Sequence, residues 1–395
     1  MQTEADPAMT APPSPMRVPA YTLLAAALTC SVMLCGAWEM YQAGSMLTLD
    51  TVPHESRDFR QGRTTGAIEK QLDQKIPARK SLIAFANVLR YLVNHSAGEQ
   101  VRLGRQDWLF LNEELQFHKD SAANLKARIE LLHAVSRALA REDVTLVVAL
   151  VPDKARIEAA YLASGQVPDY NRSRYQVAVD GLRAQGVTVV DLQTPLALAA
   201  KQAPVYYRSD THWNQTGAQL AARTIASEIR SLNLDMEPTA FRSETNSVAT
   251  ERVGDLLFLM GLDRVPNALR PQPDRERSTL TRQASPETSG GLFGDASVPV
   301  VLTGTSYSLR GNFHGFLQEA LGVKILNAAK DGAGFLQATT QYLQDESFRS
   351  SKPRVLLWEV PERFLGTPLG EESQWLESVG LTSASHPAGG KQSGP

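Results

Sequence analysis

Apolar and polar residues follow two patterns along this chain, and together the patterns predict a parallel sheet covered by helices. Continuous β-rich apolar runs, typical of strands that are buried on both faces, lie at 144–151, 187–190, 298–303, 324–326 and 354–358. Apolar residues at helical spacing lie at 121–141, 171–185, 214–232, 308–321 and 334–343. Strands that alternate with helices predict an α/β fold in which helices cover both faces of the sheet.

The N-terminal region has a different pattern, which predicts a transmembrane helix. Residues 20–38 contain no charged side chain and approach the ~20 residues that a membrane-spanning helix needs. A core helix of this length would show polar positions on one face. Since Arg17 precedes the run, the positive-inside rule favours a cytoplasmic N-terminus. We therefore predict a disordered cytoplasmic tail at 1–19 and an anchor at 20–41, with a signal peptide cleaved near Ala43 as the alternative.

Three further segments interrupt the regular pattern. Residues 42–100 read as a linker followed by a helical segment that Pro77 kinks or splits. The sequence at 101–111 predicts a hairpin. Residues 263–296 are rich in Pro, Arg, Ser and Gly, which predicts either a mobile active-site loop or a disordered excursion. Residues 368–395 are expected to form a disordered tail.

Composition argues against one class of ligand but does not identify a ligand. The formal net charge is −2 and 43% of the residues are hydrophobic, so nothing favours nucleic acid as a ligand. Both cysteines, Cys30 and Cys35, lie inside the N-terminal apolar run. The rest of the chain therefore cannot form a disulfide, which is compatible with a reducing or an oxidising compartment.

The stretch Tyr206–Gly217, YYRSDTHWNQTG, carries the strongest chemical signal. Asp210 and His212 are two residues apart, so in an extended segment their side chains point to the same side. Ser306 follows an apolar run, and the carboxyl ends of strands are where open α/β sheets expose reactive groups. A serine hydroxyl needs an adjacent base, and a carboxylate can orient that base. These residues predict a Ser-His-Asp triad.

Other interpretations of the same residues remain open. The Asp-x-His pair can be an ordinary loop hydrogen bond, and small residues are common in turns such as Gly-Thr-Ser. With another carboxylate, Asp210 and His212 could also ligate a metal, but the remaining histidines are scattered, so we predict no metal and no cofactor. The backbone N–H of Ser306 could contribute to an oxyanion hole. Further candidates for the oxyanion hole or for substrate binding are Gly304, Tyr307, Arg310, Asn327 and Gly332.

Six segments, taken in order, resemble the alginate O-acetyltransferase AlgJ/AlgX family: GRQDWLFL, LVPDKARI, YYRSDTHWNQTGA, VLTGTSYS, NAAKDGAG and VLLWEVPERFL. The resemblance implies an SGNH-hydrolase-like domain at 101–367 in which the Asp-x-His motif precedes the serine, a permuted order. It also implies that Ser306 is the acyl nucleophile, His212 the general base and Asp210 its orienting carboxylate. The apparent anchor and the short sequence after PERFL favour the AlgJ branch, because the AlgX branch carries a C-terminal carbohydrate-binding domain.

The resemblance implies a function as well. The expected protein is anchored in the bacterial inner membrane and acts in the periplasm, where it acetylates an exopolysaccharide, alginate-like or cellulose, through an acetyl-Ser306 intermediate. Its expected partners are the polysaccharide, a membrane-bound O-acyltransferase that supplies acetyl groups, and the polysaccharide synthesis and export complex. Two alternatives are a carbohydrate acetylesterase with the same triad and a non-catalytic polysaccharide assembly factor. A long distance between Ser306 and His212 would favour the assembly factor.

Overall fold

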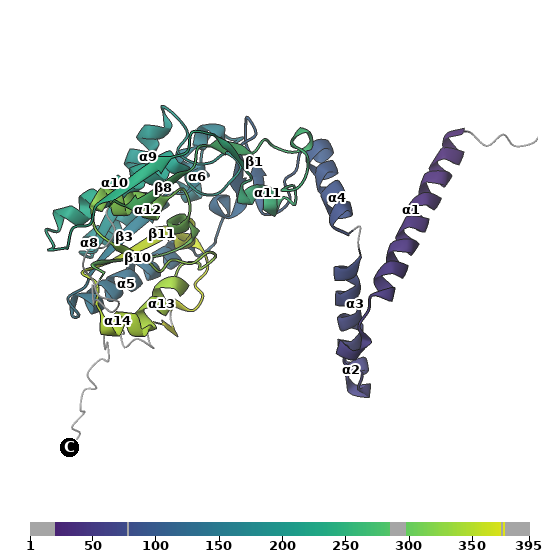
Figure 1. The fold of residues 1–395 in the computed structure, drawn as a ribbon, viewed down its shortest axis with the longest axis horizontal. Coiled ribbons are helices and arrows are strands. Elements are labelled where there is room, and N and C mark those ends of the chain that lie inside the picture. The colour runs from purple at the N-terminus through teal and green to yellow at the C-terminus, as the bar shows by residue number, and fades with distance from the viewer. Residues whose placement is uncertain (1–19, 77–78, 285–297, 373, 376–395) are drawn as a thin grey trace, which may run out of the picture. The chain divides into compact units, whose positions relative to one another are not determined.

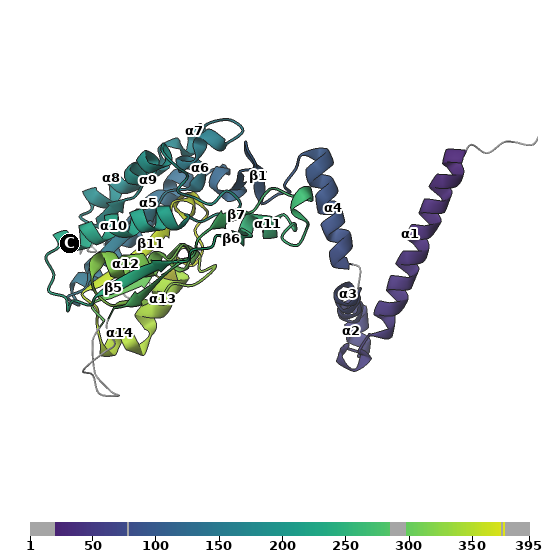
Figure 2. The same cartoon turned by 45° about the horizontal axis from the view of Figure 1, so that its top comes forward.

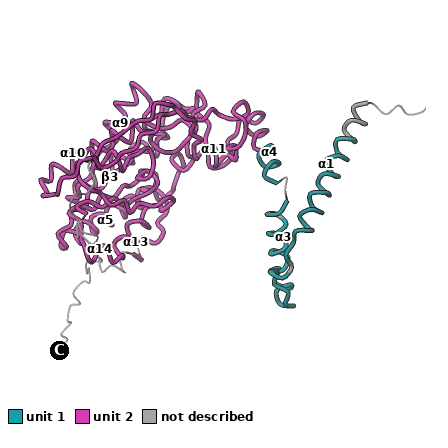
Figure 3. The backbone as a smooth tube through the Cα atoms, in the orientation of Figure 1, with its two compact units in different colours: residues 1–86 teal, residues 87–395 magenta. Residues whose placement is uncertain are grey.

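The computed structural model describes residues 20–76, 79–284, 298–372 and 374–375. The chain forms two compact units, residues 1–86 and 87–395 (Figure 3). The predicted tail at 1–19 lies outside the described residues.

The first unit is helical, and its last helix continues into the second unit. Its elements are α1 Ala20–Ser45, η1 Leu49–Thr51, α2 Ser56–Arg60, α3 Arg63–Lys75 and α4 Arg79–Asn94. The helical segment predicted within 42–100 is therefore present, and α3 and α4 end and begin on either side of Pro77. In the described part of the chain, no helix combines the length and apolar character that a membrane crossing requires. The anchor at 20–41 stays a prediction.

The second unit is built on the parallel sheet that the apolar runs predict. The strand order is β10-β9-β11-β3-β4, and every neighbouring pair is parallel. The strands are β3 Thr145–Val151, β4 Thr188–Asp191, β9 Val300–Thr303, β10 Ile325–Asn327 and β11 Val355–Pro361. All residues of β9 and β11 are buried, which explains why these segments appear in the sequence as continuous apolar runs.

Helices cover both faces of the sheet (Figure 1). Successive side chains of a strand point to opposite faces: Val147, Ala149 and Val151 enter one core cluster, and Leu146, Val148 and Leu150 enter the other. The first cluster includes residues of α9 Gln193–Ala200, α10 Gln215–Ser231 and α12 Phe313–Leu321. The second includes residues of α5 Ser121–Ala140, α8 Arg174–Ala184 and α13 Gln337–Gln344.

Among the described residues, three small antiparallel sheets lie outside the central sheet. They are β1 Val101–Leu103 with β2 Leu109–Leu111, β5 Phe241–Thr245 with β8 Thr279–Gln283, and β6 Thr250–Arg252 with β7 Asp274–Glu276. The first is the predicted hairpin at 101–111. The β5–β8 pair packs against α12, as the turned view shows (Figure 2).

Two predictions about irregular segments are wrong in part. The segment predicted as a loop at 263–296 forms β7 and β8, and Asp274 accepts hydrogen bonds from the backbone N–H groups of Arg208 and Ser209 at 2.8 and 2.9 Å. Its polar strands face solvent in part and lack an apolar period, so the sequence pattern does not reveal them. Residues 285–297 lie outside the described residues.

The prediction of a disordered tail at 368–395 is also wrong in part, because its first residues are folded. Glu372 forms a buried ion pair with Arg128 at 2.6 Å, and Trp375 is 5% exposed. These contacts with the folded core order the start of the segment. Residues 376–395 lie outside the described part.

Candidate active site

The loop that carries Asp210 and His212 is closed by backbone pairing at its base. Tyr206 and Trp213 form an isolated antiparallel bridge, and Tyr207 N–H donates to the carbonyl of His212 at 3.1 Å. Trp213 is completely buried and belongs to the hydrophobic core. The short loop thus presents Asp210 and His212 together, next to the N-terminus of α10.

Ser306 stands on a turn directly after β9, at the carboxyl edge of the sheet. Gly304 has φ +146°, a conformation that favours glycine. A Cβ atom at this position would also lie 2.6 Å from Oε2 of Glu359, so no larger residue fits. The Thr305 side chain then caps a short 3₁₀ helix that begins at Ser306. The turn aims the serine toward the Asp210–His212 loop.

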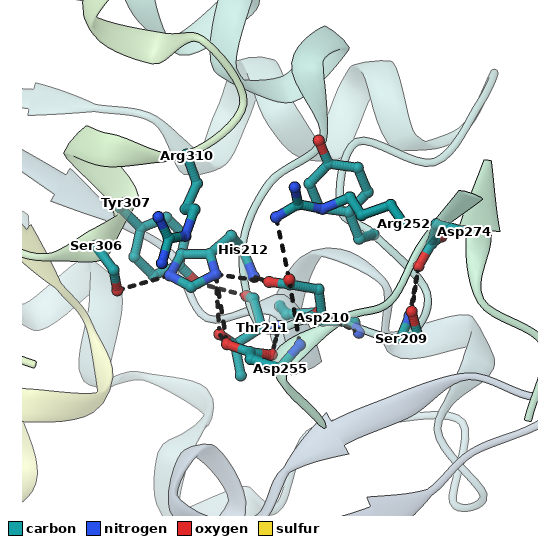
Figure 4. A network of polar contacts seen from close by, with 12 residues as sticks. Ser209, Asp210, Thr211, His212, Arg252, Asp255, Asp274, Ser306, Tyr307 and Arg310 are labelled. Atoms are coloured by element: carbon teal, nitrogen blue, oxygen red, sulfur yellow. Dashed lines mark hydrogen bonds and ion pairs between the residues drawn. The ribbon is translucent and has the colours of Figure 1, made fainter. Parts of the chain in front are cut away.

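The structure brings the three predicted side chains into one hydrogen-bonded line (Figure 4). His212 Nε2 lies 2.7 Å from Ser306 Oγ, and His212 Nδ1 lies 2.6 Å from Asp210 Oδ1. Asp210 Oδ1 also accepts the backbone N–H of His212 at 3.0 Å. A base between a hydroxyl and an orienting carboxylate is the geometry that makes a serine nucleophilic.

The surroundings of Asp210 keep it ionised. Burial alone would raise its pKa, but the hydrogen bond from His212, the charge of the imidazole and the Arg252 guanidinium hold the pKa of Asp210 below its usual range. Arg252 Nη2 lies 3.2 Å from Asp210 Oδ2, and the backbone N–H of Asp255 donates to the same oxygen at 3.3 Å. An ionised Asp210 can accept a hydrogen bond from His212 Nδ1–H and so stabilise the imidazole once Nε2 has been protonated.

Asp255 places a second carboxylate beside the imidazole. Its Oδ2 lies 3.5 Å from His212 Nδ1, and its Oδ1 accepts the backbone N–H of Thr211 at 2.7 Å. Burial and then the charge of Asp210 raise the pKa of Asp255. Donor atoms of Asp210, His212 and Asp255 lie within 4.8 Å of one another, the spacing of a metal site. His212 Nδ1 is already hydrogen-bonded to Asp210 Oδ1, and Asp210 Oδ2 pairs with Arg252. A metal ion would have to displace these contacts, so the geometry fits a triad better than a metal site.

Glu359 fixes the turn that carries Ser306. Its carboxylate accepts the backbone N–H of Thr305 at 2.7 Å, the Thr305 hydroxyl at 3.0 Å and the Ser308 hydroxyl at 3.0 Å. Glu359 is 1% exposed. Burial raises its pKa, although the bonds from Thr305 and Ser308 oppose that rise. Glu359, near the carboxyl end of β11, therefore holds the turn that follows the neighbouring strand β9.

The predicted substrate-binding candidates occupy different environments. Tyr307 is 1% exposed, its ring meets the His212 imidazole edge-on at 4.8 Å, and its hydroxyl donates to the carbonyl of Thr211 at 2.8 Å. Tyr307 therefore packs against the catalytic loop, and its contact with a substrate stays a prediction. Asn327 donates to the carbonyl of Ser308 at 3.1 Å, a structural contact beside the site.

Arg310 and the turn at Gly332 are the more open candidates. Arg310 Nη2 pairs with Asp331 Oδ2 at 2.7 Å, and both side chains are well exposed. The turn is brought to the site by a hydrogen bond from Lys330 N–H to the carbonyl of Gly304 at 3.2 Å. Gly332 has φ +68°, with no atom near its missing Cβ. Contacts of Arg310 and Gly332 with a substrate stay predictions.

Sequence reasoning missed Arg252, Asp255 and Glu359. Arg252 ends the polar strand β6, and Asp255 opens the short apolar helix α11 Asp255–Leu259. Neither residue belongs to a motif that indicates chemistry. Glu359 lies within VLLWEVPERFL, one of the segments that carry the resemblance, and could have been found as a carboxylate at the carboxyl end of a buried strand.

Comparison with known proteins identifies the family and the fold. Residues 101–362 match the family described as "SGNH hydrolase-like domain, acetyltransferase AlgX". The chain is 34% identical over 316 residues to the "Probable alginate O-acetylase AlgJ" of Pseudomonas aeruginosa, covering 77% of this chain and 80% of that protein. The solved O-acetyltransferase domain of Pseudomonas putida AlgJ superposes with a TM-score of 0.63 at 33% identity, covering 71% of this chain and 98% of that one. Pseudomonas aeruginosa AlgX superposes with a TM-score of 0.53 at 25% identity, covering 66% and 62%.

Proposed function

The chain belongs to this family of SGNH hydrolase-like O-acetyltransferases, and from that premise we propose that it acetylates hydroxyl groups of an alginate-like exopolysaccharide through an acetyl-Ser306 intermediate. One observation carries the proposal: His212 Nε2 lies 2.7 Å from Ser306 Oγ while Asp210 holds the other imidazole nitrogen at 2.6 Å. The greater similarity to AlgJ than to AlgX supports the AlgJ branch.

In the first half-reaction, Ser306 is acetylated. Its Oγ bonds to the carbonyl carbon of an acetyl donor while its proton passes to His212 Nε2. The protonated imidazole, stabilised by the Asp210 carboxylate, then gives that proton to the departing group as the bond between acetyl and donor breaks. In the part of the chain that the structure describes, the backbone N–H of Ser306 has no protein acceptor. That N–H is suited to stabilise the oxyanion of the tetrahedral intermediate.

In the second half-reaction, the acetyl group moves to the polymer. A sugar hydroxyl gives its proton to His212 Nε2 as its oxygen bonds to the acetyl carbon. The bond to Ser306 Oγ breaks, and the serine takes the proton back. Ser306, His212 and Asp210 thus act in both half-reactions, and no metal or cofactor is needed to balance the reaction.

The finer parts of the proposal concern place and partners. We propose that residues 20–41 anchor the chain in the bacterial inner membrane, because residues 20–38 carry no charge. The catalytic unit then works in the periplasm, with a membrane-bound O-acyltransferase as donor and within a polysaccharide synthesis and export complex. The relatives named alginate O-acetylase support alginate as the polymer.

An acceptor-dependence experiment tests this function. The protein is incubated with an aryl acetate, with and without mannuronate oligosaccharides, and acetylated sugar and free acetate are both measured. We expect acetylated sugar with the wild type and with Ser231→Ala, which removes an exposed hydroxyl elsewhere on the chain, and none with Ser306→Ala. Free acetate as the only product, whatever the acceptor, would instead identify the acetylesterase alternative.

The third alternative, a non-catalytic assembly factor, predicted a long distance between the serine and the histidine. The 2.7 Å contact between Ser306 and His212 is a reacting distance. The enzymatic proposal is therefore favoured over the assembly factor.

A further inference from the structure

Lys154 is a completely buried lysine to which the triad chemistry assigns no role. It follows the carboxyl end of β3 and opens α6 Lys154–Ile157, within the segment LVPDKARI. Its relative exposure is 0%. Lysines are rarely fully buried unless their charge is compensated. The environment of its ammonium group therefore requires an explanation.

Three backbone carbonyls surround the Lys154 Nζ atom. It lies 2.5 Å from the carbonyl oxygen of Leu109 and 2.9 Å from those of Arg208 and Asp210. Carbonyl oxygens only accept hydrogen bonds, so all three contacts need an N–H from the lysine. A protonated amine has three N–H donors and a neutral one has two. The geometry thus describes an ammonium ion with every donor used.

These carbonyls belong to two segments that meet at the active site. Leu109 lies in β2 of the hairpin, whereas Arg208 and Asp210 lie in the loop that carries the triad carboxylate. The same two segments share one direct backbone bond, from Leu109 N–H to the carbonyl of Arg208 at 3.0 Å. Lys154 adds a link from the sheet to both of them, and one link ends on the Asp210 backbone itself.

We propose that Lys154 is a positioning residue whose protonated amine holds the Arg208–Asp210 backbone, so that the Asp210 carboxylate stays in line with His212 Nδ1. Loss of the proton removes one of the three links together with the positive charge that attracts the carbonyls. Activity then has an alkaline limit set by Lys154. The inference rests on the proposed function, because it concerns the same triad.

Charges from several elements act on this ammonium. Burial lowers the pKa of Lys154 to about 8, although the carboxylates of Glu114, Asp274, Asp210 and Asp255 all favour its charged form. The rings of Trp108 and Phe110 lie 5.1 and 5.2 Å from Nζ and also favour a cation. The proton is therefore held near neutral pH and released at mildly alkaline pH.

The first test is the pH profile of the wild-type full-length protein. The rate of Ser306 acetylation by an aryl acetate is measured in single turnovers between about pH 6.5 and pH 10. Above about pH 8 we expect the rate to fall roughly tenfold per pH unit, following the protonated fraction. Circular dichroism at each pH separates this fall from unfolding. A rate that stays level to pH 10 in the folded protein would overturn the proposal.

The second test compares side chains at the same position. Lys154→Gln removes the charge, and we expect a loss of roughly tenfold to a hundredfold in acetylation rate at pH 7 with no alkaline fall. Lys154→Arg keeps the charge at all pH values used, so it should recover part of the rate and shift the fall beyond the measured range. Lys126→Gln, at an exposed lysine of α5, should match the wild type in both respects.

The outcomes separate this inference from the proposed function. A wild-type rate with Lys154→Gln, or an unchanged alkaline fall with Lys154→Arg, contradicts the positioning role. If these variants do not fold, the wild-type profile decides alone. Acetylation that persists in Ser306→Ala would refute the proposed function, whereas Ser306-dependent acetylation without an alkaline limit refutes only the role of Lys154.

Discussion

The carboxylate of Glu359 accepts the backbone N–H of Thr305, with Oε2 2.7 Å from the nitrogen. This bond joins the carboxyl-terminal half of β11 to the turn after β9, and the two strands are neighbours in the sheet. Thr305 directly precedes Ser306, so the position of the nucleophile depends on a side chain from a strand much later in the sequence. The glycine at 304 allows this close approach, because a Cβ there would collide with the same carboxylate.

Glu359→Gln should weaken both catalysis and folding. The amide keeps one acceptor oxygen but replaces the other with a donor, so one of the bonds from Thr305 or Ser308 is lost. We expect roughly a tenfold fall in kcat and a loss of about 1–2 kcal/mol in the free energy of unfolding. Steady-state turnover of an aryl acetate and denaturant unfolding measure both, with Glu346→Gln, on the exposed helix α14 Glu346–Ser350, as control. An unchanged kcat would show that catalysis does not depend on the hydrogen bonds between Glu359 and this turn.

Asp210→Asn should make His212 a poor base without displacing its imidazole. An amide can hold His212 in the wrong tautomer and cannot stabilise the imidazolium, so kcat should fall by ~10³ to 10⁴-fold. Asp255→Asn removes a carboxylate that lies farther from Nδ1, at 3.5 Å against 2.6 Å for Asp210. Its effect on kcat should be much smaller. Equal losses in the two variants would mean that the roles of the two carboxylates have been assigned wrongly.

Glu114 should make stability depend on pH in a defined direction. Burial raises its pKa to about 6, above the unfolded value of about 4.3. The contribution of Glu114 to stability is therefore fully present below about pH 4.3 and is lost as pH rises through about 6.

Glu114→Gln lacks this titration, so the unfolding free energies of variant and wild type should diverge by about 2 kcal/mol between pH 4 and pH 7, in favour of the variant at the higher pH. Chemical denaturation of both proteins at the two pH values measures the change. A difference that is the same at both pH values would refute the shifted pKa.

The Arg128–Glu372 pair should stabilise the segment after β11. Both side chains are buried, and Arg128 also donates to the carbonyls of Leu365, Thr367 and Pro368. Arg128→Met would leave Glu372 without its partner and should cost about 3–5 kcal/mol in unfolding free energy.

Lys126→Met is the matched control for that change. Lys126 lies on the same helix and pairs with Glu130 in solvent, so its loss should cost less than about 1 kcal/mol. Similar costs for the two substitutions would argue that residues beyond 367 are not held by this ion pair.

The sequence predicted the central sheet and the triad because both follow from local signals. Strands buried on both faces, such as β3 and β11, appear as apolar runs, and reactive residues such as Ser306 follow directly after them. Arg252 was not predicted, because it reaches the site only through its tertiary contact with Asp210. Glu359 was missed although its place near the carboxyl end of a buried strand was a usable signal, because its contact with Thr305 joins two strands that are far apart in the sequence. Strands β7 and β8 were missed since their residues are polar and partly exposed, so hydrogen bonds rather than apolar packing define them.

The central claim is that Ser306 carries the acetyl group. The most direct measurement incubates the protein with an acetyl donor, stops the reaction in acid and locates the acetyl group by peptide mass spectrometry. We predict one added acetyl group on the peptide that contains Ser306, its loss when a mannuronate oligosaccharide is added before the acid, and none in Ser306→Ala. Full acetyl transfer by Ser306→Ala, or an acetyl group that appears only on another residue, would contradict the account.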